Sequence, residues 1–548
     1  MESSFALCRH FRRTHFGFYR TVDVATTEHF ATHCGTVIPF VDLWWACLIW
    51  TLPAGQAKRG ALGHMQQLLL SGRYGDHEFR WQKMFGPVYR MKGCFGQDRL
   101  MVADPLALQT ILNSPLFVRT GMFDILMRLL FGEESVICTE GRFRHGDITR
   151  SKLSVDVGDK HRRIRAAMNS GFTAAAVRTY KAVFEKVAET LSEQLENSPA
   201  GSINICPLLS LATLNAISEA VLRYSTQDLG EDFVANNVQV VKVSGTQSGT
   251  QILVEALSAG FPMWLWRAGM ALPTTTFKIF RKLRYLTDQL ARRIIRERRD
   301  AATQGLEMND DYFSDLLASD NMGEDEIIAQ VGILLVAGQE TTANTIAFAL
   351  LELARHPDFQ EKLRDEIHSA LGTSQGAGPY DSMPLLNALI KEITRLYPAL
   401  PLADRVALQD TIIPLAEAIT TSTGEQITQI PILKGQFVTL AIASYQRLEP
   451  RWGKDVHEFN PSRWLDGTVS AGDAVGPYAN LLSFLGGPHT CLGWRFAILE
   501  IQVILCQLVS KFSFAQAEGE SIKPRFLNNL MPVVSSGEKA VPLHITRL

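Results

Sequence analysis

Residues 484–497 read FLGGPHTCLGWRFA, and this stretch decides the fold. Cys491 stands between glycines in a loop before an apolar segment, which we predict to be a buried helix over about residues 493–512. Glycines let the chain turn tightly and approach a flat ligand closely. A cysteine just before a helix N-terminus has its thiolate stabilised by main-chain N–H groups and the helix dipole, as a metal-ligating sulfur requires. For an isolated cysteine, a buried and inert side chain would be the better interpretation.

The composition excludes several classes of protein. The 548 residues include 54 basic and 56 acidic side chains, and 46% are hydrophobic. This balance of charge does not predict a nucleic-acid-binding surface, and the hydrophobic share excludes a disordered chain. The eight cysteines are scattered and form no Cys-x-x-Cys pair. We therefore expect neither a zinc site nor a disulfide scaffold, but a reducing environment.

The N-terminal segment, residues 1–59, contains a candidate membrane anchor at about residues 36–52, TVIPFVDLWWACLIWTL. A helix that spans a bilayer needs about 20 apolar residues. This stretch is slightly shorter and contains Pro39 and Asp42, but its tryptophans suit a membrane interface. An apolar helix packed on the body of the protein is the alternative. We expect residues 60–548 to form one domain behind this segment.

A long helix is predicted over about residues 324–355, and its centre reads AGQETTA, residues 337–343. Acidic residues in its first turn suit the helix dipole, and its apolar centre places it in the core. Glycine and threonine are poor helix formers, so their presence there needs a reason. One helical face carries Gly338, Thr341, Thr342 and Thr345. Small and hydroxyl side chains on that face would leave room for a ligand and a water chain, unless the threonines only bond back to the backbone.

Charged residues recur in three further motifs. Glu392 and Arg395 are three positions apart on a predicted helix, so they are neighbours. Taken alone, they would form a surface pair worth about 1 kcal/mol at most. Arg463 follows in FNPSRW and Arg405 stands in LADRV. The predicted helix over residues 158–168 carries several basic side chains, which either donate to a carboxylate or form a solvated face.

Strand patterns are confined to short regions. Alternating apolar and polar residues predict strands at residues 88–92 and 99–103, joined by a turn at residues 95–97. A further strand region is predicted over residues 410–438, and most of the remaining chain has helical patterns. We therefore predict a mainly α fold with a small β lobe.

Together these motifs resemble those of the cytochrome P450 family. The pattern Phe-x-x-Gly-x-His-x-Cys-x-Gly-x-x-x-Ala resembles its haem-binding loop, in which a cysteine thiolate is the axial ligand. AGQETT resembles its oxygen-activating sequence, and Glu-x-x-Arg with a downstream Pro-x-Arg resembles the network that braces the haem loop. The resemblance runs from about residue 60 onward, is closest to fungal members of secondary metabolism, and implies the cytochrome P450 fold.

The resemblance also implies a role for each matching residue. Cys491 would ligate the haem iron. Glu340 and Thr341 would relay protons to iron-bound dioxygen, and Gly338 would leave space for it. The residues implied in binding the haem and its propionates are His161, Arg165, Arg405, His489, Phe484 and Gly493. The residues implied in bracing the fold are Glu392, Arg395 and Arg463.

The implied activity is haem-thiolate monooxygenation of a lipophilic small molecule such as a terpenoid. One oxygen atom would enter an unactivated C–H bond, and the other would leave as water. The sequence contains no Rossmann fingerprint or flavin module. Electrons would therefore come from a separate NADPH-cytochrome P450 reductase to haem b, with the catalytic domain facing the cytosol at the endoplasmic reticulum membrane. The alternatives are a dioxygen-independent isomerase or dehydratase, against which the Glu340–Thr341 pair argues, and a non-enzymatic haem sensor, against which the apolar pocket segments argue.

The sequence departs from the family pattern in several places. His161 stands where the family has tryptophan, and His489 stands where it more often has arginine, so haem affinity is expected to depend on pH. Residues 142–157, RFRHGDITRSKLSVDV, separate two motifs that family members commonly join. We interpret them as an insertion, which as a genuine segment would be a surface loop. A retained intron is the origin that we consider for it, and if the segment is an artefact of gene prediction, the mature transcript would lack these codons.

Residues 261–266, FPMWLW, form an aromatic cluster between predicted helices. Three interpretations are open for this cluster. It could line a substrate entrance, dip into a membrane, or pack onto the body of the protein.

Overall fold

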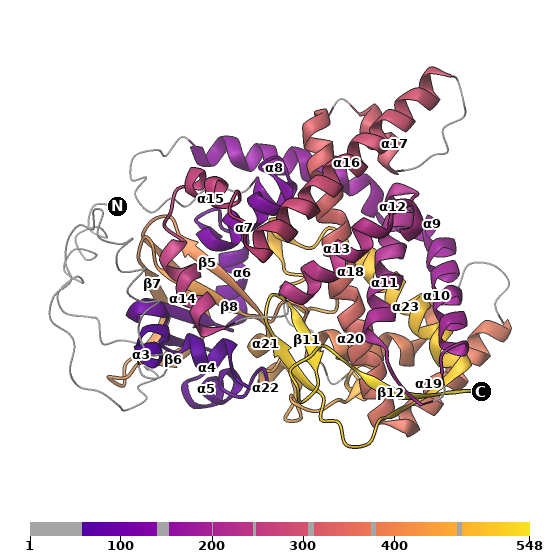
Figure 1. Cartoon of the computed structure of the whole chain (residues 1–548). Coiled ribbons are helices and arrows are strands. Elements are labelled where there is room, and N and C mark those ends of the chain that lie inside the picture. The colour runs from indigo at the N-terminus through magenta and orange to yellow at the C-terminus, as the bar shows by residue number, and fades with distance from the viewer. Residues whose placement is uncertain are drawn as a thin grey trace.

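The structure is a computed structural model, and it describes residues 57–139, 153–199, 201–244, 248–304, 312–319, 321–373, 380–467, 469 and 474–548. Helices make up most of the described chain, the labelled strands β5 to β8 lie in a smaller lobe on the left of Figure 1, and β11 and β12 lie near its centre and lower right. The predicted mainly α fold with a small β lobe is therefore confirmed. The candidate membrane anchor lies outside the described residues, as do residues 142–152 of the proposed insertion.

The β lobe is built on a mixed sheet. In spatial order its described strands are β1 (Val88–Lys92), β2 (Asp98–Val102), β8 (Phe437–Ala441), β5 (Leu402–Ala407) and β3 (Phe117–Arg119). The first two form the antiparallel pair that the alternating pattern predicts, and β2 pairs with β8 in parallel. At the other edge, β3 and β5 are antiparallel and place Arg119 opposite Arg405. A separate hairpin joins β6 (Thr411–Thr420) to β7 (Gln426–Ile432).

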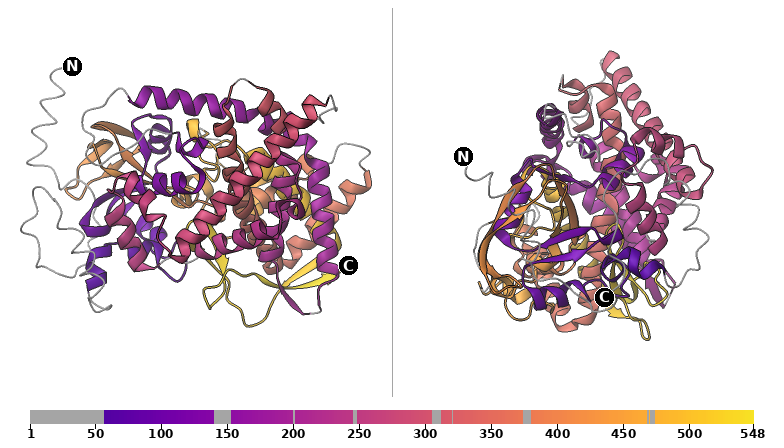
Figure 2. Two further views of the ribbon diagram at one scale, coloured as in Figure 1. Left: turned by 45° about the horizontal axis from the view of Figure 1, so that its top comes forward. Right: turned by 90° about the vertical axis from the view of Figure 1, so that its left-hand side faces the viewer.

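The longest helix, α18 (Glu324–Arg355), has the predicted limits and runs through the helical core. Its first turn contains three acidic residues, and the carboxylate of Glu326 accepts the N–H of Gly323 at 3.1 Å. The helices packed against α18 include α11 (Cys206–Ile217), α16 (Thr275–Thr303), α20 (Pro384–Leu396) and α23 (Trp494–Lys511). In the right-hand view of Figure 2 the strands lie mainly on one side and the long helices on the other.

The remaining described α-helices complete the fold. They are α3 (Ala57–Leu62), α4 (Met65–Leu69), α5 (Glu78–Phe85), α6 (Pro105–Asn113), α7 (Gly121–Phe131), α8 (Leu153–Asn169), α9 (Ala174–Thr179), α10 (Lys181–Glu196), α12 (Thr226–Leu229), α13 (Glu231–Ser244), α14 (Gly249–Ser258), α15 (Met263–Gly269), α17 (Tyr312–Ala318), α19 (Pro357–Thr373), α21 (Ile442–Tyr445) and α22 (Glu449–Trp452).

A small sheet near the C-terminus joins distant parts of the chain. Its described strands, in spatial order, are β4 (Ser202–Asn204), β12 (Pro542–Arg547) and β9 (Phe512–Gln516), and β10 (Lys523–Phe526) pairs separately with β11 (Leu530–Val533). The N–H of Val541 donates to the side chain of Asn204 at 3.0 Å, and the carbonyl of Val541 accepts the N–H of Ile205 at 3.2 Å. These bonds fix the C-terminal loop beside the start of α11.

Two local predictions need correction. The last residues of the proposed insertion, 153–157, are not loop but the first turn of α8. Residues 263–266 of the aromatic cluster likewise belong to a helix, α15, rather than to a connection between helices. Trp264 on this helix is 68% exposed, so its side chain does not pack onto the body of the protein as one interpretation expected.

Candidate active site

The loop that carries Cys491 is shaped by its main chain. The N–H of Cys491 donates to the carbonyl of Phe484 at 2.8 Å, which closes the loop just before α23. Gly487 has a φ of 64°, and a Cβ there would lie 2.6 Å from the carbonyl oxygen of Leu112 at the end of α6. Only glycine combines this conformation with such close contact. The glycine-rich sequence therefore allows the loop to lie directly against α6.

The surroundings of Cys491 distinguish it from a core cysteine. Burial raises the pKa of its thiol, while the N–H of Gly493 and the charge of Arg165 lower it. Cys491 nevertheless has accessible surface, whereas Cys206 and Cys506 are buried and have thiol pKa values raised by burial to about 12. A sulfur that is reachable and has a cation and an N–H donor beside it can ligate a metal. The alternative of an inert core cysteine does not fit this position.

Basic side chains gather beside the cysteine loop. The rings of His161 on α8 and His489 lie 4.8 Å apart between centroids. Arg165, one turn further along α8, donates to the carbonyl oxygen of Thr490. Burial lowers the pKa of Arg165, the Cys491 thiolate raises it, and Arg119 lowers it. A buried guanidinium next to a second guanidinium is costly without an anion.

Arg119 adds to this basic group and was missed by the sequence analysis. It lies on β3 directly opposite Arg405 of β5, and its guanidinium donates to the carbonyl of Ile137 at 3.0 Å. The pairing of the two strands, far apart in sequence, brings the two arginines together. Arginine binds carboxylates in bidentate fashion, so the group suits an anion with two carboxylates. A haem with its two propionates fits the residues present, with Cys491 as the sulfur ligand.

Glu340 and Thr341 lie at the centre of α18, but they bond in different directions. The carboxylate of Glu340 accepts hydrogen bonds from Ser210 of α11 and from Lys539 of the C-terminal loop. The hydroxyl of Thr341 donates to the carbonyl of Ala337 at 2.9 Å, as a threonine with a local backbone role does. The structure thus brings the two residues together as neighbours without a hydrogen bond between their side chains.

Ser210 and Lys539 could not be recognised from local sequence patterns. They are 130 and 199 residues away from Glu340, on segments that only the tertiary fold places beside α18. The side chains of Glu340 and Lys539 are 13% and 15% exposed, so the pair is largely shielded from solvent.

The structure explains Gly338 differently from the sequence analysis. A Cβ at this position would lie 2.8 Å from the side chain of Ile217 on α11. The missing side chain is therefore accounted for by the close packing of α11 against α18. Because a side chain at position 338 would point at Ile217, the structure gives no support to the prediction that Gly338 leaves space for dioxygen.

Glu392 and Arg395 form a fully buried ion pair. Arg395 binds both carboxylate oxygens of Glu392 at 2.8 and 2.9 Å, and both side chains are 0% exposed. Arg463 donates to Glu392 at 3.1 Å, as the sequence analysis predicted, and Trp464 donates at 2.9 Å. The alternative of a surface pair is wrong, because the pair has no solvent contact and additional donors complete its hydrogen bonds.

Gln446 connects this buried network to the cysteine loop and was also missed. Its amide nitrogen donates to the carbonyl of Arg395 at 2.8 Å. Its amide oxygen accepts the N–H of Leu482 at 2.9 Å and the hydroxyl of Ser483 at 3.0 Å, directly before Phe484. The network thereby fixes the entry of the loop that carries Cys491.

Comparisons with known proteins agree with this geometry. The family model described as Cytochrome P450 matches residues 53–540. The chain is 28% identical to cytochrome P450 monooxygenase 91 of Postia placenta over 494 residues, which cover 85% of this chain and 88% of that protein. It is 29% identical to ganoderic acid synthetase of Ganoderma lucidum, with 81% and 83% covered. It is also 29% identical to cytochrome P450 monooxygenase claP of Ampulloclitocybe clavipes, with 79% and 80% covered.

Proposed function

The chain belongs to the cytochrome P450 family and is thus an oxidoreductase of the monooxygenase type, and on this premise we propose that it oxidises a lipophilic small molecule in fungal secondary metabolism. A terpenoid is the class that we favour. Ganoderic acid synthetase is among the relatives, and all the relatives named above are fungal proteins. The observation that carries the proposal is the reachable sulfur of Cys491 beside a cluster of arginines and histidines.

The basic cluster and Cys491 would hold the cofactor. Arg165, Arg405 and Arg119, with His161 and His489, would bind the two propionates of haem b. The haem, when bound, supplies the activation of dioxygen, which a thiolate ligand favours by donating electron density to the iron. Phe484 and Gly493 would shape the loop on either side of Cys491, and the Glu392 network would keep that loop in place.

Glu340 and Thr341 would move protons at the centre of α18. Both donors to Glu340, the hydroxyl of Ser210 and the ammonium of Lys539, lie on other segments. For a proton to pass from the Glu340 carboxyl to the Thr341 hydroxyl, the carboxylate has to give up at least one of these bonds. We propose that Lys539 holds Glu340 between turnovers and that Thr341 exchanges its bond to Ala337 when it receives the proton.

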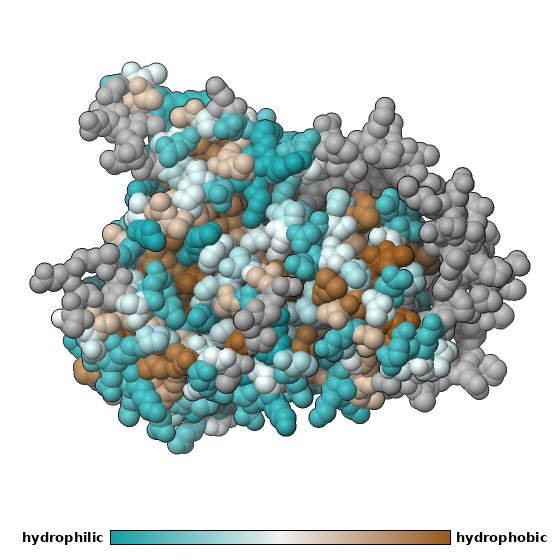
Figure 3. Space-filling view, turned by 180° about the vertical axis from the view of Figure 1, so that it is seen from behind, coloured by the Kyte–Doolittle hydropathy of each residue, from teal (hydrophilic) through white to brown (hydrophobic). Residues whose placement is uncertain are grey.

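Electrons would reach the haem from a separate NADPH-dependent reductase at the endoplasmic reticulum membrane. Seen from behind, the molecule has a group of hydrophobic side chains in the right-hand half of its surface (Figure 3). Helices α14 and α15 and the residues that follow each of them carry further exposed hydrophobic side chains, namely Val254, Leu257, Phe261, Trp264 and Leu272. We propose that they contact the membrane. Among the described helices, α18 is long and apolar enough to cross a bilayer, but 72% of its apolar stretch is buried inside the protein, so it is a core helix.

The test is the difference spectrum of the reduced protein with carbon monoxide. The wild type is expected to show the red-shifted Soret band of thiolate ligation, and Cys491→Ala is expected to lose it. Cys506→Ala is the matched control, because Cys506 is buried on the helix that follows. A wild-type protein that binds haem without this band would contradict the proposal. NADPH consumption with reductase and substrate separates a monooxygenase from an isomerase, a dehydratase or a sensor.

A further inference from the structure

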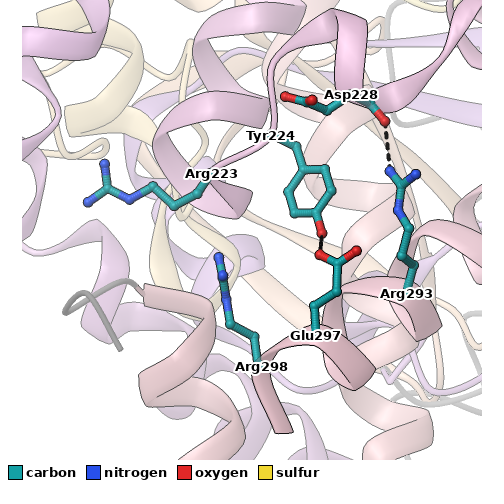
Figure 4. Close-up of a pocket in the computed structure, with 6 residues that line it drawn as sticks. All are labelled: Arg223, Tyr224, Asp228, Arg293, Glu297 and Arg298. Atoms are coloured by element: carbon teal, nitrogen blue, oxygen red, sulfur yellow. Dashed lines mark hydrogen bonds between the residues drawn. The ribbon is translucent and has the colours of Figure 1, made fainter. Parts of the chain in front are cut away.

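A pocket of about 430 Å³ lies between α16 and the segment formed by α12 and its connection to α11. Its lining consists mainly of charged residues and shares no residue with the candidate active site. The lining residues are Arg223, Tyr224, Asp228, Arg293, Glu297 and Arg298 (Figure 4). A volume in this range is sufficient for a small molecule, but three guanidinium groups around one space exclude an apolar ligand.

The two carboxylates of the pocket already have partners. Asp228 accepts the hydroxyl of Ser225 at 2.6 Å and its N–H at 2.8 Å, and these bonds, together with the charge of Arg293, lower the pKa of Asp228. Glu297 accepts the hydroxyl of Tyr224. Both carboxylates thus accept hydrogen bonds from uncharged donors, and Asp228 also lies close enough to Arg293 to feel its charge.

Arg293 and Arg223 form no hydrogen bond to the side-chain carboxylates of Asp228 and Glu297. Arg293 lies over the ring of Tyr224, 5.1 Å from its centroid, and donates to the main-chain oxygen of Asp228 at 2.7 Å. Its Nε is buried without a hydrogen-bond partner among the described residues. The guanidinium of Arg223 forms no hydrogen bond or ion pair with any described side chain or carbonyl. In Figure 4 the guanidinium of Arg298 points up from α16 toward the side chain of Arg223.

The backbone at Arg223 is strained. It ends a short π-helical turn, Ser218–Leu222, with φ 61° and ψ 31°, a left-handed conformation that glycine or asparagine adopts more readily. Ser218 fixes this turn, because its hydroxyl donates to the carbonyl of Tyr224 at 2.5 Å. Strain of this kind and single π-helical turns are concentrated at functional sites. The strained arginine stands at the edge of the cavity.

We propose that this pocket binds the phosphate group of a ligand. Phosphate oxygens match the fork of a guanidinium, and the ligand would supply the negative charge that Arg223 lacks and an acceptor for the buried Nε of Arg293. The phosphate could belong to a soluble metabolite or to a lipid headgroup. The site stands apart from the haem chemistry and requires no bound haem.

Arg223→Asn is the decisive variant. Asparagine keeps the left-handed turn at lower strain and removes the guanidinium, so the variant is expected to melt at the same or a higher temperature while phosphate binding weakens by about tenfold or more. The binding assay is calorimetric titration of the full chain with sodium pyrophosphate at low ionic strength. Arg296→Gln is the matched control, since Arg296 lies on α16 but does not line the pocket, and its affinity is expected to stay within about twofold of the wild type.

A second arm identifies the source of the phosphate. Vesicles of phosphatidylcholine are compared with vesicles that also contain phosphatidic acid, in flotation with wild type and Arg223→Asn. Pyrophosphate binding that depends on Arg223 indicates a soluble phosphate compound, and phosphatidic acid binding that depends on Arg223 indicates a headgroup. The proposal is overturned if Arg223→Asn changes neither, or if Arg296→Gln weakens binding equally.

Discussion

Two glutamates on neighbouring helices have opposite surroundings. Glu392 on α20 is 0% exposed and is held by Arg395, Arg463 and Trp464. Glu340 on α18 is 13% exposed and is held by Lys539 and Ser210 alone among the described residues. The first carboxylate has no freedom to move, because its donors are buried and arranged on every side. The second has fewer bonds, one of them to a flexible lysine, so its carboxylate can exchange partners.

The comparison separates a residue that maintains the structure from one that we propose takes part in the reaction. A buried ion pair does not by itself add stability, but the loss of one partner leaves an unpaired buried charge. An ion pair with fewer hydrogen bonds costs less free energy to break, and the loss of such a pair leaves the fold intact. If this distinction is correct, variants of the two glutamates should differ in kind: one should lose much of its stability, and the other should keep its stability and work slowly.

The largest effect is expected for Glu392→Ala. It leaves the buried Arg395 guanidinium without its carboxylate, which should lower the free energy of unfolding by about 3–5 kcal/mol. Urea unfolding followed by circular dichroism measures the change. Arg364→Ala, which removes a half-buried arginine of α19 that bonds to Gln360 and to carbonyl oxygens, is a control for the loss of a hydrogen-bonded charged residue outside the network. Wild-type stability of Glu392→Ala would show that the network does not brace the fold.

Glu340→Gln tests the other side of the comparison. The variant should keep its unfolding free energy within about 1 kcal/mol of the wild type, since a neutral amide can still accept from Ser210 and Lys539. Substrate turnover should fall by about 100-fold, as expected when a proton-transferring group is lost. Product formation is measured against NADPH consumption with a reductase. A variant that folds normally and retains full turnover would exclude Glu340 from proton transfer.

Gly338→Ala is expected to have a smaller effect, on packing. The added methyl group would press against Ile217 of α11, and overpacking of this kind costs about 1–3 kcal/mol. Ile217→Ala in the same chain should recover part of the loss, because it makes room for the methyl group. Thermal unfolding of the single and double variants gives the coupling. If Gly338→Ala lowers the stability equally in the wild-type chain and in the Ile217→Ala chain, helix packing is not the reason for the glycine.

The sequence was most informative where the determinants are local. The limits of α18, the first two strands and the Glu392–Arg395 pair follow from periodicity, acidic residues at a helix start and an i, i+3 spacing. The partners Ser210 and Lys539 and the arginine opposite Arg405 did not follow, since only tertiary packing and strand pairing bring them close. Gly338 was misinterpreted for the same reason: its neighbour Ile217 lies on a different helix.

A third glutamate forms an ion pair with an arginine that is exposed to solvent, and the pair tests how far this exposure weakens the interaction. Glu326, at the start of α18, binds Arg163 at 2.6 and 2.9 Å, and the arginine is 44% exposed. The hydrogen bonds from Arg163 lower the pKa of Glu326 from 4.5 to about 2. Because the folded-state pKa is the lower one, the stabilisation is complete above about pH 4.5 and is lost as the pH falls toward 2.

Glu326→Gln should therefore lose about 1 kcal/mol or less at neutral pH, and its difference from the wild type should shrink as the solution is acidified. Urea unfolding at pH 7, 4.5 and 3 follows this difference, and high salt at pH 7 should reduce it because the arginine is exposed. A difference in unfolding free energy that grows on acidification would mean that folding raises the pKa of Glu326 instead of lowering it. A loss as large as that of Glu392→Ala would show that burial of the partner is not what separates the bracing glutamate from the others.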